Sequence, residues 1–376
     1  MGLTYTPLDP DSLSPNAQRA LSSPPAKMMA ARGMAPIADP ADLVTVFYQL
    51  AQDDDDKVKG AAVKSIKTLP DAMLLAGLKN PSLDERVLDF FGKESQGRTE
   101  ILEAIVLNRA TADETVADIA GVANAKITDL IAGIDDRLLR YPEIVGKLYN
   151  NTNARMSSVD RAVELAIRND VTVPGIAAWN ELRDALLEGR KDEGGGDVVE
   201  VVDPGQDEAI ANALGRDDEE EDAADGAPET PVQEEKKEIN PNDWKDLGIA
   251  VKIRMATIGG GFWRSKAISD PKPIVAMAAL KSPMVKDKEV LKWAGNAGLD
   301  KRLIAFIVNK KEWVQQYSFK VALVQNPKTA IKDAMRLVPH LREKDLKIIM
   351  RSKGVPTAVV SCARRVVQQR AGGKKG

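Results

Sequence analysis

Few residues in this chain have the type or spacing that catalysis or metal binding requires. His340 is the only histidine and Cys362 the only cysteine, so multi-histidine metal sites, multi-cysteine metal sites and internal disulfides are excluded. His340 follows Pro339 in a turn with no nucleophile motif, which favours a surface position over a catalytic role. Cys362 lies on or beside an apolar helical stripe, where a small buried hydrophobic residue is expected. We predict a protein that is not an enzyme and has no catalytic residue, cofactor or metal.

Four consecutive aspartates at positions 53–56 could suggest a calcium site. A calcium loop of the EF-hand type needs spaced ligands, a central glycine and a closing glutamate, and this run lacks them. Aspartate side chains also accept hydrogen bonds from the free N–H groups at the start of a helix, where their charge is favourable. We interpret the run as a solvated capping turn before a helix.

The sequence from Gly259 to Arg264 has two interpretations. Three glycines followed by Phe262, Trp263 and Arg264 could form a flexible loop that contacts phosphate through Arg264 and Lys266. The segment lacks the Gly-Lys-Ser/Thr ending of a P-loop and follows no strand. The favoured interpretation is a helix end, with glycines terminating one helix and the two aromatic rings packing into the core.

Charge is distributed very unevenly along the chain. Residues 250–376 contain 27 Lys and Arg but 8 Asp and Glu, a net charge of +19, whereas the remainder carries −22. This asymmetry favours a polyanionic partner, self-masking, or both. Basic residues alternate with aromatic ones here, as in phosphate contacts combined with base stacking, although each aromatic side chain is itself expected in the core. The candidate polyanion-binding residues are Arg254, Arg264, Lys266, Lys310, Lys311 and Lys320.

A strongly acidic segment, residues 189–242, separates the two ends of the chain. It is rich in charge and poor in large apolar residues, so burial cannot offset the entropy of ordering it, and we expect a disordered linker. One stretch, Glu208–Leu214, could form a transient helix. The linker also supplies a candidate intramolecular competitor for the basic module, the acidic run Asp217, Asp218, Glu219, Glu220, Glu221 and Asp222.

The remaining composition indicates an all-α protein without a membrane span. Aromatic residues make up 4% of the chain, and Ala, Val, Leu and Ile carry the apolar load, which suits closely packed helices. The longest apolar runs, such as 274–280, are far shorter than the roughly 20 residues that span a bilayer. Residues 1–40 contain scattered prolines and no secretory signal, so we expect a disordered leader and a cytoplasmic location.

Two helical modules with similar internal patterns are expected, an acidic one at 41–188 and a basic one at 243–371, with a disordered tail at 372–376. In the first, Leu74–Pro81 precedes the apolar segment 87–92; in the second, Val275–Pro283 precedes 290–295, and 321–327 is a third copy. The shared pattern is helix, Asn-Pro or Ser-Pro turn, helix. The polar residue can cap the next helix, and proline cannot continue the previous one.

The segment Leu50–Ala62 joins an acidic turn, a Val-Lys pair and helix-opening alanines, and it resembles the turn inside HEAT repeats. Together with the internal repeats, it makes both modules similar to the HEAT-like superfamily, and also to bacterial leucine-rich-variant repeats. That resemblance implies two α-solenoid modules, a fold that hosts many functions. The leading hypothesis is a scaffold or adaptor that binds an unidentified protein.

The alternative is nucleic-acid binding by the basic module, with the acidic linker as competitor. Some HEAT-like proteins, including alkylpurine DNA glycosylases, grip DNA on a basic concave face, but no carboxylate here matches the context of those enzymes. Basic residues gathered on one face would favour nucleic acid, whereas an even spread would favour a protein partner. The oligomeric state is left open.

Overall fold

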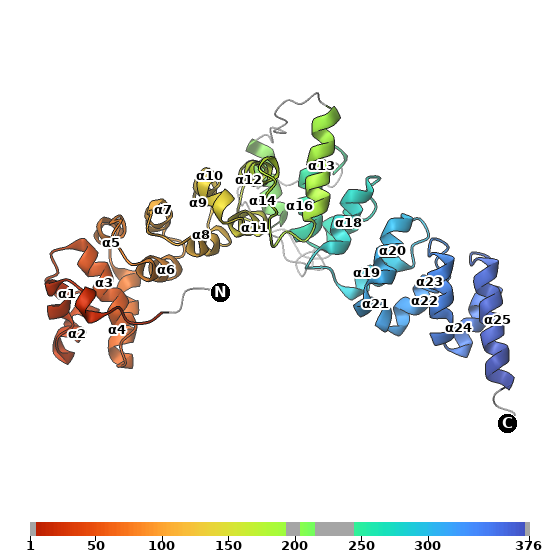
Figure 1. The fold of residues 1–376 in the computed structure, drawn as a ribbon, viewed down its shortest axis with the longest axis horizontal. Coiled ribbons are helices and arrows are strands. Elements are labelled where there is room, and N and C mark those ends of the chain that lie inside the picture. The colour runs from red at the N-terminus through yellow and green to blue at the C-terminus, as the bar shows by residue number, and fades with distance from the viewer. Residues whose placement is uncertain (1–4, 193–203, 215–243, 373–376) are drawn as a thin grey trace, which may run out of the picture. The chain divides into compact units, whose positions relative to one another are not determined.

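Helices are the only regular elements in the part of the chain that the structure describes. The computed structural model describes residues 5–192, 204–214 and 244–372 (Figure 1). No strand occurs in these ranges, so the predicted all-α class is confirmed. The chain divides into two compact units: unit 1 contains residues 1–176 and 201–211, and unit 2 contains residues 177–200 and 212–376. None of the described helices has the length and apolar character to cross a membrane.

Unit 1 is built from short helices that contact the next helix but one. Helix α3 contacts α5, α5 contacts α7 and α7 contacts α9, while α6 contacts α8 and α8 contacts α11. Alternate contacts of this kind are typical of stacked helical hairpins. The helices are α1 (Pro15–Ala20), α2 (Pro24–Ala31), α3 (Pro40–Ala51), α4 (Asp56–Thr68), α5 (Asp71–Leu78), α6 (Glu85–Glu94), α7 (Thr99–Leu107), α8 (Asp113–Ala120), α9 (Ala125–Ala132), α10 (Asp135–Arg140), α11 (Glu143–Asn150), α12 (Met156–Arg168) and most of α14 (Pro204–Leu214).

The expected disordered leader is, from Tyr5 onwards, a folded part of unit 1. It contains a 3-10 helix, η1 (Pro10–Ser12), as well as α1 and α2. Most of the prolines that suggested disorder lie in the first turn of a helix, where no backbone N–H is needed and the fixed φ angle of proline suits the helix. Pro7 and Pro36 lie outside the helices. Ser14 and Ser23 cap α1 and α2 by accepting hydrogen bonds from backbone N–H groups.

The aspartate run caps a helix, as expected. The Asp55 carboxylate accepts a hydrogen bond from the backbone N–H of Lys57 at 2.9 Å, at the start of α4. Asp53 accepts one from the N–H of Asp55 and pairs with Lys27 at 2.7 Å. The capping turn is therefore present, with Asp53 and Asp55 held by these contacts.

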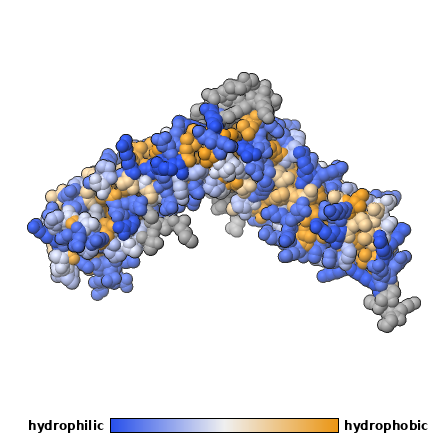
Figure 2. All heavy atoms as spheres, viewed as in Figure 1, coloured by the Kyte–Doolittle hydropathy of each residue, from blue (hydrophilic) through white to orange (hydrophobic). Residues whose placement is uncertain are grey.

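Unit 2 also consists of helices in alternate contact. Helix α16 contacts α18, α18 contacts α20, and α19 contacts α22. In the view of Figure 2, hydrophilic side chains alternate with smaller apolar areas over these helices. The helices are α13 (Trp179–Asp192), α16 (Ile249–Ile258), α17 (Gly261–Ala267), α18 (Pro273–Lys281), α19 (Asp287–Ala294), α20 (Lys301–Asn309), α21 (Lys311–Gln315), α22 (Tyr317–Gln325), α23 (Ile331–Leu337), η3 (Val338–His340), α24 (Glu343–Arg351) and α25 (Thr357–Gly372).

The boundary between the units differs from the expected one at residue 188. Helix α13 belongs to unit 2, where it contacts α16 and α18 and where Glu181 pairs with Lys281 at 2.7 Å. The apolar face of α13, which includes Leu182, is visible in the sequence, but the helix that covers this face is not. The expected linker contains α14, whose Asp207 accepts hydrogen bonds from Ser157 in unit 1. The acidic run 217–222 lies outside the described residues.

A buried asparagine joins successive helical hairpins in unit 1. Asn108 follows α7, and its side-chain amide donates hydrogen bonds to the carbonyl oxygens of Leu78 at 2.7 Å and Asn80 at 2.9 Å, at the end of α5. Its own oxygen accepts from the N–H of Ala110. The side chain therefore caps the C-terminus of an earlier helix.

The same arrangement recurs in unit 2. Asn326 follows α22 and donates to the carbonyl oxygens of Ala294 at 2.7 Å and Asn296 at 3.1 Å, at the end of α19. Its oxygen accepts from the N–H of Lys328. Units 1 and 2 thus share this contact, although only Asn326 belongs to an Asn-Pro pair. The Asn326 amide caps an earlier helix rather than the next one, which was the expectation for the Asn-Pro turns. The resemblance to a particular repeat family stays a prediction.

Candidate functional site

Two predicted polyanion-binding residues lie inside unit 2. Arg254 in α16 has no exposed surface and Arg264 in α17 is 1% exposed. The Arg264 guanidinium donates to the carbonyl oxygen of Gly259 at 2.6 Å and pairs with Glu289 at 3.2 Å. Because neither guanidinium can reach an external phosphate, the prediction was wrong for both residues. The expected helix end at Gly259 is present, with Trp263 buried and Phe262 partly exposed.

Two other candidates lie at the surface over aromatic rings. The Lys266 ammonium is 5.7 Å from the centre of the Phe262 ring, and the Lys310 ammonium is 5.7 Å from that of Phe306. Lysine side chains commonly lay their apolar stems along such rings and keep the charge in water. Both remain able to meet an anion.

The remaining two candidates meet in a hollow of unit 2. Lys311 and Lys320 line a space of about 520 Å³ together with Arg336 and His340, which the sequence analysis did not select. We call this space the basic hollow. Its other lining residues are Val308, Asn309, Val314, Gln315 and Leu337, and no aspartate or glutamate is among them.

Five consecutive elements position the basic hollow. Lys311 begins α21, Lys320 lies in α22, and Arg336 and His340 come from α23 and η3, with the end of α20 completing the wall. Arg336 pairs with Asp333 on its own helix at 3.4 Å. Within the described residues, Lys311 and Lys320 have no ion pair, so their charges are the least compensated in the hollow.

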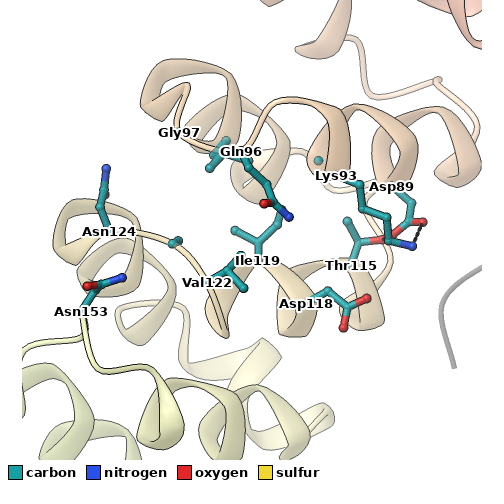
Figure 3. A pocket seen from close by; sticks show the side chains of 13 residues that line it. Asp89, Lys93, Gln96, Gly97, Thr115, Asp118, Ile119, Val122, Asn124 and Asn153 are labelled. Atoms are coloured by element: carbon teal, nitrogen blue, oxygen red, sulfur yellow. Dashed lines mark hydrogen bonds and ion pairs between the residues drawn. The ribbon is translucent and has the colours of Figure 1, made fainter. Parts of the chain in front are cut away.

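A second candidate site is a groove in unit 1. Two adjoining hollows, of about 180 and 710 Å³, share Lys93, Gln96, Asp118 and Val122 and lie along α6, α8 and α11. Figure 3 shows the smaller of the two. We call them together the unit 1 groove. Asp118 lies 3.8 Å from Lys147, and Val122 is 57% exposed. The groove therefore combines charged, amide and apolar surfaces.

A buried carboxylate organises one wall of this groove. Asp89 is 2% exposed and accepts hydrogen bonds from Tyr5 at 2.7 Å, Lys93 at 2.9 Å and Thr115 at 2.7 Å. Burial, with a contribution from Asp89, raises the pKa of Tyr5 to about 12. Burial alone would lower the pKa of Lys93, but its hydrogen bonds with Tyr5 and Asp89 raise it above the ordinary value. The wall is a closed, satisfied network rather than an acid–base pair poised near neutral pH.

The N-terminal segment Tyr5–Leu8 lies against α3 and α6 beside this wall. Tyr48 donates to the carbonyl oxygen of Thr6 at 2.9 Å. Gln49 accepts from the N–H of Leu8 at 2.9 Å and donates to its carbonyl oxygen at 3.3 Å. The Tyr5 ring packs edge-on against Phe90. Helices α3 and α6 thus hold an irregular peptide through its backbone and an aromatic side chain.

The described residues contain no group of three or more histidine, cysteine, aspartate or glutamate side chains arranged to hold a metal ion. Comparisons with protein-family models, with curated proteins and with solved structures gave no match. The function therefore has to be inferred from the two sites themselves.

Proposed function

We propose that this protein is a non-enzymatic helical-repeat scaffold that binds another polypeptide in the unit 1 groove. The supporting observation is the segment Tyr5–Leu8, which α3 holds through the side chains of Tyr48 and Gln49. Helix α6 contacts the same segment through Asp89 and Phe90. Tyr5 contacts Asp89 and Lys93, which both line the groove. A surface that holds one backbone thus continues directly into an open groove.

The lining of the groove suits an extended peptide. Gln96 and Asn153 are exposed carboxamides, which can donate to and accept from a peptide backbone. Val122 offers an exposed apolar contact between them, and the Asp118–Lys147 pair offers both charges. Specificity would come from side chains that contact Val122 and the charged pair.

A peptide-display selection with the full chain tests this function. Peptides selected on the native protein should bind the Val122→Arg variant at least about tenfold more weakly, since a buried cation at an apolar contact costs more than 1.4 kcal/mol. The matched control is Leu107→Arg, because Leu107 is 55% exposed at the end of α7 and does not line the groove. Equal binding by the native protein and the Val122 variant would refute the groove as the binding site.

A second candidate function is nucleic-acid binding by unit 2. The observation that favours it is the basic hollow, where Lys311, Lys320 and Arg336 meet without an aspartate or glutamate in the lining. Backbone phosphates release counterions when lysine and arginine neutralise them, which supplies most of the affinity of non-specific binding. Loss of binding as salt rises would be the first expected property.

A further inference from the structure

We propose that the basic hollow binds single-stranded nucleic acid in preference to duplex. This inference rests on the second candidate function and assigns its substrate class and its site. It departs from a picture of diffuse phosphate contacts spread over the basic module.

The shape of the site carries the first step. The hollow has a volume of about 520 Å³, within the roughly 300–1,000 Å³ of pockets that enclose small ligands. In a duplex the bases are stacked inside, and the surface that a protein meets is the convex sugar–phosphate backbone. The base edges are read in the major groove by a protein helix or strand that enters it. A hollow is concave, so the convex surface of a duplex does not fit into it. It can accept a nucleotide only from a strand whose bases are free to turn outward.

The chemistry of the lining carries the second step. Val308, Val314 and Leu337 provide apolar surface for the face of a base, and Asn309 and Gln315 provide carboxamides for its edge. The cations of Lys311, Lys320 and Arg336 can reach the flanking phosphates. One hollow therefore contains side chains that can contact the phosphate of a nucleotide and side chains that can contact its base.

Aromatic stacking contributes little here. Trp313 is 7% exposed and Phe319 is fully buried, and the two rings stack on each other inside unit 2. The stacking role considered for the aromatic residues of the basic module therefore does not extend to these two. Without a stacking platform, binding should depend mainly on phosphates, with steep salt dependence and little sequence preference.

Some other surface cations of unit 2 pair with nearby acids. Arg302 pairs with Asp300 at 3.2 Å, and Lys347 pairs with Glu343 at 2.7 Å on its own helix. Lys311 and Lys320 have no such partner in the described part of the chain. Cations without an ion pair in the described residues are thus present where the surface is also hollowed.

Fluorescence anisotropy with the full chain tests the proposal, using a labelled 15-nucleotide deoxythymidine strand and the same strand in a duplex at low salt. We expect the single strand to bind at least about fivefold more tightly. The combined variant Lys311→Gln, Lys320→Gln, Arg336→Gln should weaken it about tenfold or more. Its salt slope should fall by about 2, because each phosphate contact to a single strand contributes about 0.7.

The control removes the same charge elsewhere in unit 2. Lys288, Lys292 and Lys301 are exposed and lie outside the hollow, and changing all three to glutamine should weaken binding less than threefold. Equal losses in both triple variants, or tighter duplex binding, would overturn the hollow while leaving nucleic-acid binding intact. No binding of either oligonucleotide would overturn the second candidate function as well. Tighter binding of a phosphoserine peptide than of the strand would assign the hollow to a phosphoprotein and refute the inference.

Discussion

At the scale of single residues, buried polar side chains form hydrogen bonds to helices that are distant in the sequence. Asn108 and Asn326 each satisfy two carbonyl oxygens at the end of a helix about one repeat earlier. The turn at Asn326 was predictable from residue type, because the next residue is Pro327 and proline cannot continue a helix. Asn108 is followed by Arg109 and offers no such signal. The partner carbonyls were not predictable, since they belong to a helix that only the fold brings near.

Replacing Asn326 by alanine should destabilise unit 2 by about 2 kcal/mol or more, because two carbonyl oxygens lose their donor in a buried setting. Tryptophan fluorescence during urea unfolding measures this effect selectively. All five tryptophans lie in unit 2, at Trp179, Trp244, Trp263, Trp293 and Trp313. Asn309→Ala is the control, since Asn309 is exposed, and it should change stability by less than about 0.5 kcal/mol.

The hydroxyl of Tyr5 should stabilise unit 1 only below strongly alkaline pH. The pKa of Tyr5 is raised from 10.0 to about 12 in the folded chain, so the unfolded chain ionises first. The stability that this hydroxyl adds is complete below pH 10 and is lost as pH rises towards 12. Lys93 has a raised pKa as well, so its contribution also declines at alkaline pH.

Comparison of the native protein with Tyr5→Phe measures this loss. The difference in unfolding midpoint, followed by far-UV circular dichroism, should be largest at pH 8 and should shrink by pH 11 because the variant keeps the ring but has no hydroxyl to ionise. A difference that stays constant with pH would show that the Tyr5 hydroxyl is not held by Asp89.

At the scale of helices, apolar periodicity predicted the positions of most helices. The remaining helices depend on capping residues at their ends and on the helices that pack against them. The apolar segment 87–92, expected to be helical, lies within α6, and the segment 290–295 falls on α19, which ends at Ala294. The leader was misjudged because proline signals both a break and a helix start, and only the serine before it distinguishes the two.

The candidate site was predicted only in part, for a related reason. Residue type selects arginine and lysine as surface cations, yet Arg264 is buried because Glu289 and the Gly259 carbonyl compensate it. Arg336 and His340 were missed because they join Lys311 and Lys320 through the packing of separate helices. The spacing of these residues in the sequence does not indicate that their side chains lie close together in the fold.

Close contact between α3 and α5 depends on a missing side chain. A Cβ placed on Gly77 would lie 2.2 Å from the carbonyl oxygen of Pro40, which backbone atoms cannot relieve without moving a helix. We expect Gly77→Ala to destabilise unit 1 by about 1–3 kcal/mol, as overpacked interiors do. Calorimetry measures the change in the unfolding transition of unit 1. Tryptophan fluorescence, followed over the same temperatures, identifies the transition that belongs to unit 2.

Gly60→Ala is the matched control for this prediction. Gly60 is exposed within α4, and a Cβ there would meet nothing within 4 Å. The variant should be more stable than the native protein by up to about 1 kcal/mol, because alanine favours a helix. Destabilisation by both substitutions would argue against close packing as the cause.

At the scale of the whole molecule, the charge asymmetry implies competition between the acidic segment and external polyanions. The acidic run 217–222 lies outside the described residues, so this competition stays a prediction from the sequence. A flexible tether formed by the 29 residues between α14 and Trp244 would reach roughly 30 Å, and so give a high effective concentration. Exposed ion pairs contribute at most about 1 kcal/mol each, which makes the contacts diffuse and sensitive to salt.

Changing the six acidic residues to asparagine and glutamine should therefore raise the affinity of the full chain for nucleic acid at low salt. Near half-molar salt the change should have little effect, because screening removes the competition. Anisotropy titrations at both salt concentrations measure this. If native and neutralised chains bind equally at low salt, the acidic run acts as a spacer.

The path of the chain between the units has a consequence for any attempt to divide this protein. Helix α13 belongs to unit 2 and most of α14 to unit 1, so the polypeptide passes from one unit to the other three times. A single cut between these helices leaves each half carrying an element that the opposite half needs. The two halves should consequently behave as a complementing pair rather than as separable domains.

Insertion of a specific protease site at Gly195 makes this measurable. After cleavage, the two fragments should co-elute in gel filtration without denaturant and part only as urea unfolds α13 and α14. A site at Gly226 returns α14 to the N-terminal half and exchanges α13 alone, so that pair should part at a lower urea concentration. Truncations drawn at residue 188 or 242 would strip one of these helices from the unit it completes, and failure of such a fragment to fold would say nothing about its function.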